Sequence, residues 1–384
     1  MTTSVLWNSH ASVLIRSGED LFLTDPWYGV AFSSWSPHPV PAINPDMLIG
    51  LAKSGRLRVI VSHGHGDHFD ADFLAKLGDC PIYVPKFRDG HMARLLPNAV
   101  VIDGPTRAGG CVLNSWEAAH SAVVSIDTPD CNIFHGNDVY ALPDETIDEI
   151  DRYHDDGRPR FYMGQGGSAS GWPLRYRYAD RDVRAQAKHA ATLKGLHALA
   201  TRLHATAALP YACFARVEFA GQEWLPLDSS GANANAICGG RLFVDMAPGD
   251  VYLPATGQHI PMMPSLSAHD YPRPKMPEFP DLWGTYGYRM AYFMDGIVPI
   301  ARAHGVIFAV HVGDGPVWSI GAGARHKECY VSRAVMSNVL AGRVPFADIS
   351  TGYLAEWSRE PDEPNIGFLT ELEDYGYAWA ERMK

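Results

Sequence analysis

The sequence predicts a layered protein that mixes strands with helices, of the α/β or α+β class. Short apolar segments separated by turn residues fill the first 135 positions, and a long segment at 180–205 repeats apolar residues at helical spacing. The composition is that of an ordinary globular chain, with 46% hydrophobic and 20% charged residues. A length of 384 residues leaves room for two or three domains.

The first strands are predicted at Ser4–Asn8, Ser12–Arg16 and Leu21–Thr24, which are rich in Val, Leu, Ile and Phe. Residues 30–50 contain several prolines and show no period, so we expect a surface loop there. The segment Leu57–Ser62 (LRVIVS) is short and apolar, as is typical of a strand that is buried on both faces.

A short helix and several more strands follow this buried strand. The helix is predicted at Asp70–Leu77. The strands are predicted at Pro81–Val84, Ala99–Asp103, Cys111–Ala118, Ala122–Ile126 and Asn132–His135. The clearest helix is Asp180–Ala205, where apolar residues recur at intervals of three and four.

The distribution of prolines suggests the domain boundaries. Residues 1–253 carry the predicted strands and the long helix, and we expect them to form one catalytic domain. Residues 254–283 are rich in proline and lack periodicity, which predicts a long loop or a lid. Residues 284–384 are expected to form a C-terminal α+β extension that ends in a helix.

Charge and cysteine content exclude several classes of partner and site. The net charge of −11 disfavours nucleic acid or an anionic membrane as the main partner, because both select clustered Lys and Arg. None of the six cysteines forms a CxxC pair, so a structural zinc site or a redox dithiol is not expected. The N-terminal residues lack a signal-peptide pattern and no apolar run is long enough to span a membrane, which predicts a cytoplasmic protein.

The sharpest signal is a run of metal-ligand residues directly after the buried strand, SHGHGDH at 62–68. His63 and His65 are two residues apart, so in extended backbone their side chains point to the same side and can hold one ion. The second glycine lets the chain turn sharply, so that Asp67 and His68 face a second position. This division of ligands suits a two-metal site, in which the ions lie about 3.5–4 Å apart.

SHGHGDH resembles the signature of the metallo-β-lactamase fold superfamily. His10 in NSHASVLI and Asp25 in LTDPWYG resemble the opening of its lactonase- and phospholipase-like branch. Further segments resemble, in the same order, the non-Rieske part of the CMP-N-acetylneuraminate hydroxylases: TDPWYGVAFSSW, GGSASGWP, LPYACF, MAPGD and REPD. The ordered set spans most of the chain. The resemblance implies a four-layer αββα sandwich with a C-terminal extension.

The resemblance also implies a set of ligands. The segments EAAH at 117–120 and FHGND at 134–138 stand where the family places its next histidine ligand and a bridging aspartate. The implied metal ligands are therefore His63, His65 and His120 for one ion, Asp67 and His68 for the other, and Asp138 as a bridge. Catalytic roles are implied for Asp67 and for His10, which resembles a histidine beside the site.

The chain departs from the family at its last ligand. The family completes its second metal with a histidine in a short strand after the helix, but the matching segment 208–214, ALPYACF, contains none. The second metal position therefore lacks one ligand, holds no ion, or is completed by another side chain. The candidates for that side chain are Glu218, His269 and Tyr211. The histidines of the long helix are expected on its solvated face: His189, His197 and His204.

Two reaction classes fit these residues. Zinc ions would activate water for hydrolysis of an ester, lactone, amide or phosphodiester. One or two iron ions would serve an oxygenase, since imidazole and carboxylate also suit iron and a missing ligand leaves a position for O₂. The resemblance to a hydroxylase favours the iron oxygenase, with the zinc hydrolase as the alternative. No cysteine–histidine pairs for a Rieske centre are present, so electrons would come from a separate donor or from the substrate.

The substrate is not specified by any motif. The resemblance implies a small polar metabolite. Arg175 and Arg177 in PLRYRY are the candidates for binding an anionic group on it.

Overall fold

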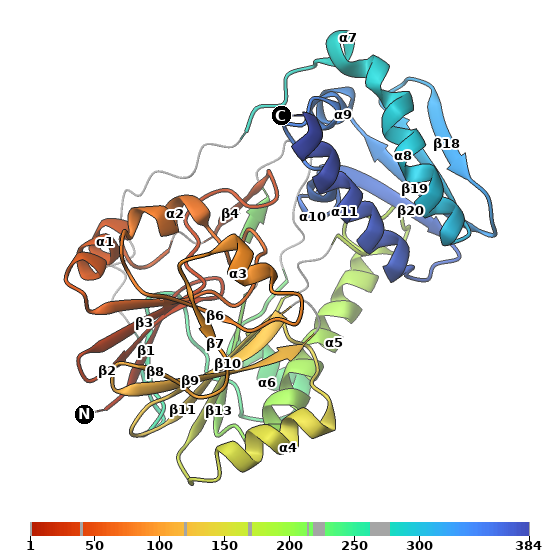
Figure 1. The fold of residues 1–384 in the computed structure, drawn as a ribbon. Coiled ribbons are helices and arrows are strands. Elements are labelled where there is room, and N and C mark those ends of the chain that lie inside the picture. Colours follow the sequence, from red (N-terminus) through yellow and green to blue (C-terminus); the bar gives the residue numbers. More distant parts are fainter. Residues whose placement is uncertain are drawn as a thin grey trace.

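The computed structural model describes residues 2–38, 41–118, 121–167, 171–212, 215–217, 227–261 and 277–383. Two sheets face each other in the larger part of the chain (Figure 1). The first sheet has the order β16 (Gln258–Ile260), β15 (Val251–Leu253), β1 (Ser4–Ser9), β2 (Ser12–Ser17), β3 (Asp20–Thr24), β5 (Leu57–Ile60), β6 (Ile82–Pro85), β7 (Val100–Ile102). Its strands from β3 to β7 run parallel to one another.

The second sheet has an antiparallel part and a parallel part. Its order is β13 (Ala207–Tyr211), β12 (Arg160–Gln165), β11 (Asn132–Asn137), β10 (Ser121–Asp127), β9 (Cys111–Ala118), β8 (Thr106–Ala108). Strands β11, β12 and β13 are parallel, whereas β8 to β11 are antiparallel. Every residue of β10, β11, β12 and β13 is buried, so both faces of this sheet are covered.

One apolar cluster fills the space between the two sheets. Val13 and Phe22 of the first sheet and Val124 and Ile133 of the second belong to it, and all four are fully buried. Such interleaving of inward-facing side chains is what holds two stacked sheets together.

Helices cover the two outer faces. Leu48 of α1 (Pro45–Lys53) and Phe73 of α2 (Ala71–Lys76) pack with Val59 outside the first sheet, and Met92 of α3 (His91–Leu95) joins them. Outside the second sheet lie α4 (Asp144–Tyr153), α5 (Arg181–Arg202) and α6 (Gly231–Cys238). The order is helix, sheet, sheet, helix, so the predicted four-layer αββα sandwich is confirmed.

The C-terminal residues build a second unit with its own core. Its sheet has the order β18 (Val317–Gly321), β17 (Val306–Val312), β19 (Arg325–Val331), β20 (Ala355–Glu360). Its helices are α7 (Trp283–Tyr286), η2 (Gly287–Arg289), α8 (Met290–Ala303), α9 (Arg333–Leu340), α10 (Phe346–Thr351) and α11 (Ile366–Met383). Phe293, Phe308, Trp357 and Phe368 are among the buried residues of its core. In Figure 1 this unit (blue) stands at one end of the sandwich, beyond α5.

A short loop at 31–35 joins the two units. Ser33 Oγ donates to the Asp348 carboxylate of α10 at 2.8 Å, and the Trp35 and Tyr353 rings meet edge to face at 5.6 Å. Ser34 Oγ donates to the carbonyl oxygen of Gly352. The same loop adjoins the predicted metal-binding segment, because the Phe32 ring lies 6.2 Å from that of His65.

Two segments differ from the sequence-based expectation. Residues 30–50 contain β4 (Trp35–Pro37), which pairs with β14 (Ala215–Val217), and the first residues of α1. The helix was missed because its proline stands at the start, where a missing N–H costs nothing, and Asn44 caps it by accepting from the Asp46 N–H at 2.8 Å. Within the predicted proline-rich loop at 254–283, β16 pairs with β15, while residues 262–276 lie outside the described residues.

None of the helices within the described ranges has the length and apolar character that a membrane crossing requires.

The junction between the two units can be tested at Gly352. A Cβ added there would overlap the carbonyl oxygens of Phe32 and Asp348, and neither backbone group can rotate away. We expect Gly352→Ala to lower the free energy of unfolding by about 1–3 kcal/mol, measured by urea denaturation. The matched control is Gly195→Ala in α5, where a Cβ meets nothing within 4 Å and should stabilise the helix by about 0.5–1 kcal/mol. A Gly352→Ala protein as stable as the parent would contradict this account of the junction.

Candidate metal centre

The SHGHGDH segment lies at the carboxyl end of β5, between the first sheet and α2. After His63 the chain makes a tight turn, in which the N–H groups of His68 and Phe69 both donate to the carbonyl oxygen of His65, at 2.9 and 2.7 Å. The turn directs Asp67 and His68 inward. His68 is fully buried and Asp67 is 6% exposed.

One group of metal-ligand atoms consists of His63, His68 and Asp138. Asp138 follows β11, so this group is assembled from both sheets. Its carboxylate lies 3.5 Å from His63 Nε2 through Oδ2 and 3.4 Å from His68 Nε2 through Oδ1. His65 Nδ1 stands beside the group, 2.9 Å from His63 Nε2, with its side chain 55% exposed.

A second group consists of His10, Asp67 and His68. His10 sits in the tight turn between β1 and β2 with φ of 44°, a left-handed conformation that few non-glycine residues adopt. Its Nε2 lies 3.1 Å from Asp67 Oδ2, and His68 Nε2 lies 3.8 Å from the same oxygen. His68 therefore belongs to both groups.

Between these ligand groups, two buried atoms lack hydrogen-bond partners among the described residues. They are Asp67 Oδ1 and His68 Nε2. Buried polar atoms are almost always partnered, because an unsatisfied one loses its hydration without replacement. A carboxylate oxygen and an imidazole nitrogen are both metal-ligand atoms, so a bound cation would satisfy both. The residues present therefore fit the metal ion that the sequence motif implies.

A buried carboxylate fixes the orientation of His68. Asp25 is fully buried and accepts from the Ser62 N–H at 2.7 Å and from Ser62 Oγ at 2.6 Å. Its Oδ2 also lies 2.7 Å from His68 Nδ1 and 2.8 Å from His135 Nε2. With Nδ1 engaged in this way, His68 presents Nε2 to the metal position, which is the usual arrangement of a ligating histidine.

Tyr211 extends this network on the side away from the ligand atoms. It is fully buried at the end of β13, and its hydroxyl donates to His135 Nδ1 and accepts from the Asn137 N–H at 3.1 Å. The structure thus places this candidate ligand behind His135 and connects it to His68 through Asp25.

The charges of the carboxylates and of His63 favour metal binding. Burial by itself would raise the pKa of Asp138, but the His68 imidazole and hydrogen bonds from neighbouring histidines hold it well below its usual range. Burial likewise opposes ionisation of Asp25, yet His135 and His68 keep its pKa low. Burial and the neighbouring His68 lower the pKa of His63 to about 4. Ionised carboxylates and a neutral imidazole are the forms that ligate metals.

Three of the residues predicted to bind metal lie outside the described residues: His120, Glu218 and His269. Their roles remain predictions from the sequence. Of the helix histidines, His189 is 4% exposed and its Nε2 lies 2.9 Å from the carbonyl oxygen of Asp228, so the expected solvated position is wrong for this residue.

The two predicted substrate-binding arginines lie at the junction with the C-terminal unit. Arg177 Nε donates to Glu356 at 2.9 Å, and its guanidinium lies over the Tyr330 ring. Arg175 is 5% exposed and donates from Nε to the carbonyl oxygen of Ala355 at 3.2 Å. Both side chains therefore tie residues 171–178 to β20.

The sequence did not identify Asp25 as the residue that orients His68, although the resemblance singled it out. In the sequence, Asp25 is an aspartate at the end of an apolar segment and is followed by a proline. It lies far from the histidine motif along the chain. Only the parallel pairing of β3 with β5 brings Asp25 beside Ser62.

The architecture and the position of the motif now decide the fold. A helix–sheet–sheet–helix sandwich carries SHGHGDH at the end of an inner strand, with Asp138 reaching it from the opposite sheet. The fold is of the metallo-β-lactamase type. The closer resemblance to the CMP-N-acetylneuraminate hydroxylases remains a prediction from the sequence.

The solved structures that match part of this chain include hydrolases and a hydroxylase. A candidate metal-dependent hydrolase from Veillonella parvula is 13% identical, with a TM-score of 0.44 over 66% of this chain and 100% of that chain. A candidate zinc-dependent hydrolase of the metallo-β-lactamase superfamily from Thermotoga maritima is 16% identical, with a TM-score of 0.30 over 55% of this chain and 75% of that one.

CmlA, a diiron β-hydroxylase from Streptomyces venezuelae, is 17% identical, with a TM-score of 0.35 over 55% of this chain and 45% of that chain. No family model and no curated protein matches the chain.

The contribution of Asp25 can be measured with Asp25→Asn. The amide cannot accept from Ser62, His68 and His135 together, so His68 should lose its fixed orientation. We expect metal affinity to fall by about 10- to 100-fold, measured by competition with a chromogenic chelator.

The matched control for this variant is Asp127→Asn. Asp127 is a buried aspartate whose Oδ1 lies 2.9 Å from Nε2 of His154, and neither residue belongs to a ligand group. The control should lose stability and keep its metal affinity. Equal metal affinity in Asp25→Asn and the parent would refute the orienting role.

Proposed function

We propose that this chain is a non-haem iron oxygenase that acts on a small polar metabolite. The observation that carries the proposal is the composition of the two ligand groups. Each combines two imidazoles with one aspartate: His63, His68 and Asp138 in one, and His10, His68 and Asp67 in the other. Two histidines and one carboxylate, with the remaining positions open, are the ligand set that iron oxygenases use.

The residues that would hold the iron are those of the two groups, with His65 beside the first. When bound, the iron would supply a change of oxidation state and open positions for O₂ and substrate. His63 and His68 are almost completely buried, so their nitrogen atoms lie in a site that excludes bulk water. Asp25 holds His68 in the orientation that this requires.

His10 is the candidate for proton transfer when only the first ligand group holds an ion. Its Nε2 lies 3.1 Å from Asp67 Oδ2, which is hydrogen-bond distance, and it is 1% exposed. A proton can therefore be held between this imidazole and the carboxylate without exchange with bulk solvent. This assigns Asp67 two tasks, as a ligand and as the partner of His10.

The electrons for oxygen chemistry would come from elsewhere. The sequence holds no cysteine–histidine pairs of the kind that bind a Rieske cluster. The proposal therefore includes a separate donor of two electrons, or a substrate that itself supplies all four electrons that O₂ takes up.

A zinc-dependent hydrolase is the second candidate, and the sharing of His68 favours it. Two ligand groups that meet at one imidazole place two metal positions next to each other, as in two-metal hydrolases. Two histidines and one carboxylate also form the ligand set of several catalytic zinc sites.

The choice of metal and atmosphere separates the two functions. Protein loaded anaerobically with Fe(II) should gain a visible absorption band on exposure to air and consume O₂ in the presence of ascorbate. Zinc-loaded protein should do neither, because zinc does not change oxidation state. Hydrolysis of p-nitrophenyl acetate or bis(p-nitrophenyl) phosphate by the zinc form under nitrogen, with an inert iron form, would instead establish the hydrolase.

Removal of single ligands should lower the iron content and abolish O₂ consumption. We expect His63→Ala to lose the ion of the first group and Asp67→Asn the ion of the second, because each substitution removes a direct bond to that ion. The control is His197→Ala in α5, whose ring packs 5.9 Å from that of Phe243 and belongs to neither ligand group. Full iron content in His63→Ala, or loss of iron in His197→Ala, would contradict the assignment of the site.

A further inference from the structure

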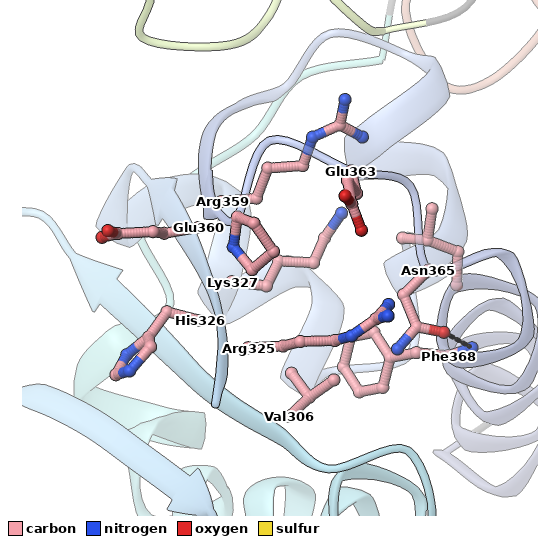
Figure 2. Close-up of a pocket in the computed structure, with 11 residues that line it drawn as sticks. Val306, Arg325, His326, Lys327, Arg359, Glu360, Glu363, Asn365 and Phe368 are labelled. Atoms are coloured by element: carbon pink, nitrogen blue, oxygen red, sulfur yellow. Dashed lines mark hydrogen bonds between the residues drawn. The ribbon is translucent and has the colours of Figure 1, made fainter. Parts of the chain in front are cut away.

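A pocket lies in the C-terminal unit. It opens between β19, the end of β20 and the first turns of α11 (Figure 2). Arg325 and Lys327 extend from β19 into this space, toward Glu363, Asn365 and Phe368. None of the residues that line it belongs to a metal-ligand group.

Lys327 is a buried amine that makes no direct ion pair among the described residues, and the Glu373 carboxylate acts on it only at longer range. Its side chain is 7% exposed, and Nζ donates to the Tyr176 hydroxyl at 3.0 Å. The same nitrogen lies 4.8 Å from the centre of the Trp357 ring. Among the described residues no carboxylate lies within 4.0 Å of it. Lysine is rarely buried unless it is paired, because the loss of hydration must be offset.

Burial lowers the pKa of Lys327 to about 7, and the neighbouring Arg359 acts in the same direction. Arg359, in contrast, is paired with a carboxylate. Its Nε donates to Asp362 at 2.9 Å, and its guanidinium lies 5.4 Å from the centre of the Trp172 ring. The pocket thus contains one cation that is already paired and one amine that is not.

Arg325 provides a second unpaired donor at the mouth of the pocket. The side chain is exposed, and among the described residues its guanidinium makes no hydrogen bond or ion pair. Figure 2 shows it pointing toward the start of α11, whereas Glu360 points away from the pocket. The first turn of this 18-residue helix adds a positive partial charge, and Asn365 caps it by accepting from the Phe368 N–H at 3.2 Å.

We propose that this pocket binds a small oxyanion, a phosphate or carboxylate group, through Lys327 and Arg325. The anion would supply the direct ion pair that the buried amine does not make among the described residues, and a guanidinium is suited to bind two of its oxygens at once. Glu363 lines the same pocket. Its carboxylate would repel a second negative group, so a ligand with a single anionic group fits the pocket better than one with two.

Binding is tested with two probes, inorganic phosphate and acetate, against chloride at the same ionic strength. The readouts are isothermal titration calorimetry and the melting temperature of the metal-loaded protein. We expect at least one probe to bind and to raise the melting temperature above the value in chloride. A response to phosphate alone or to acetate alone identifies the class of the ligand.

The variants Arg325→Gln and Lys327→Met locate the binding. Each removes one charged hydrogen-bond donor, so the dissociation constant should rise by about tenfold or more. Without the probes, Lys327→Met should be at least as stable as the parent, since it removes an unpaired buried amine and keeps an apolar side chain of similar length. The control Arg302→Gln changes an exposed arginine of α8 that does not line the pocket and should bind like the parent.

Phosphate can also bind to metal ions, so the difference between the variants and the control is decisive. Unchanged affinity in Arg325→Gln and Lys327→Met would overturn the proposal, as would the absence of any response beyond that of chloride. If Lys327→Met fails to fold, the amine has a structural role and the proposal then stands or falls with Arg325→Gln. The result does not depend on whether the metal centre is an oxygenase or a hydrolase.

Discussion

The carboxylate of Asp25 is the constraint on which the metal centre depends. It is completely buried, and its cost of dehydration is offset by the Ser62 hydroxyl and N–H and by two imidazoles. These contacts join β3 to the end of β5 and, through His135, to the second sheet. A single buried charge thus aligns the two sheets where the ligands converge. A substitution that weakens the hydrogen bonds of Asp25 therefore also changes the geometry of the metal site.

The sequence predicts the strands and most of the ligand loop because both depend on local patterns, whereas the four-layer sandwich was implied by the family resemblance. Alternating apolar strands and the spacing of His63, His65, Asp67 and His68 can be read without knowledge of the fold. Contacts that arise from distant pairing cannot: Asp25 meets His68 only because β3 and β5 are adjacent, and Tyr211 faces His135 only because β13 lies near β11. The helix at 45–53 was missed because proline is an equally good signal for a loop and for a helix start.

The C-terminal unit reaches the metal centre through the loop at 31–35. Gly66 of the ligand segment packs so closely on Ala31 that an added Cβ would lie 3.3 Å from the Ala31 Cβ, and Ser33 on the same loop binds Asp348. On α11, burial raises the pKa of Glu373, while the charges of His65 and Lys327 oppose the rise, so this acid lies within electrostatic reach of both residues. The extension therefore forms part of the surroundings of the site.

The membership of His68 in both ligand groups sets the order in which ions can be taken up. Its Nδ1 is committed to Asp25, so one lone pair, on Nε2, remains to be shared. An ion that takes this nitrogen leaves its neighbour with two ligands of its own group, and two cations placed so close together repel each other. Occupancy should consequently follow a sequence, with one tightly held ion and a second that exchanges with solution. The cell's supply of metal would then decide whether the centre works with one ion or with two.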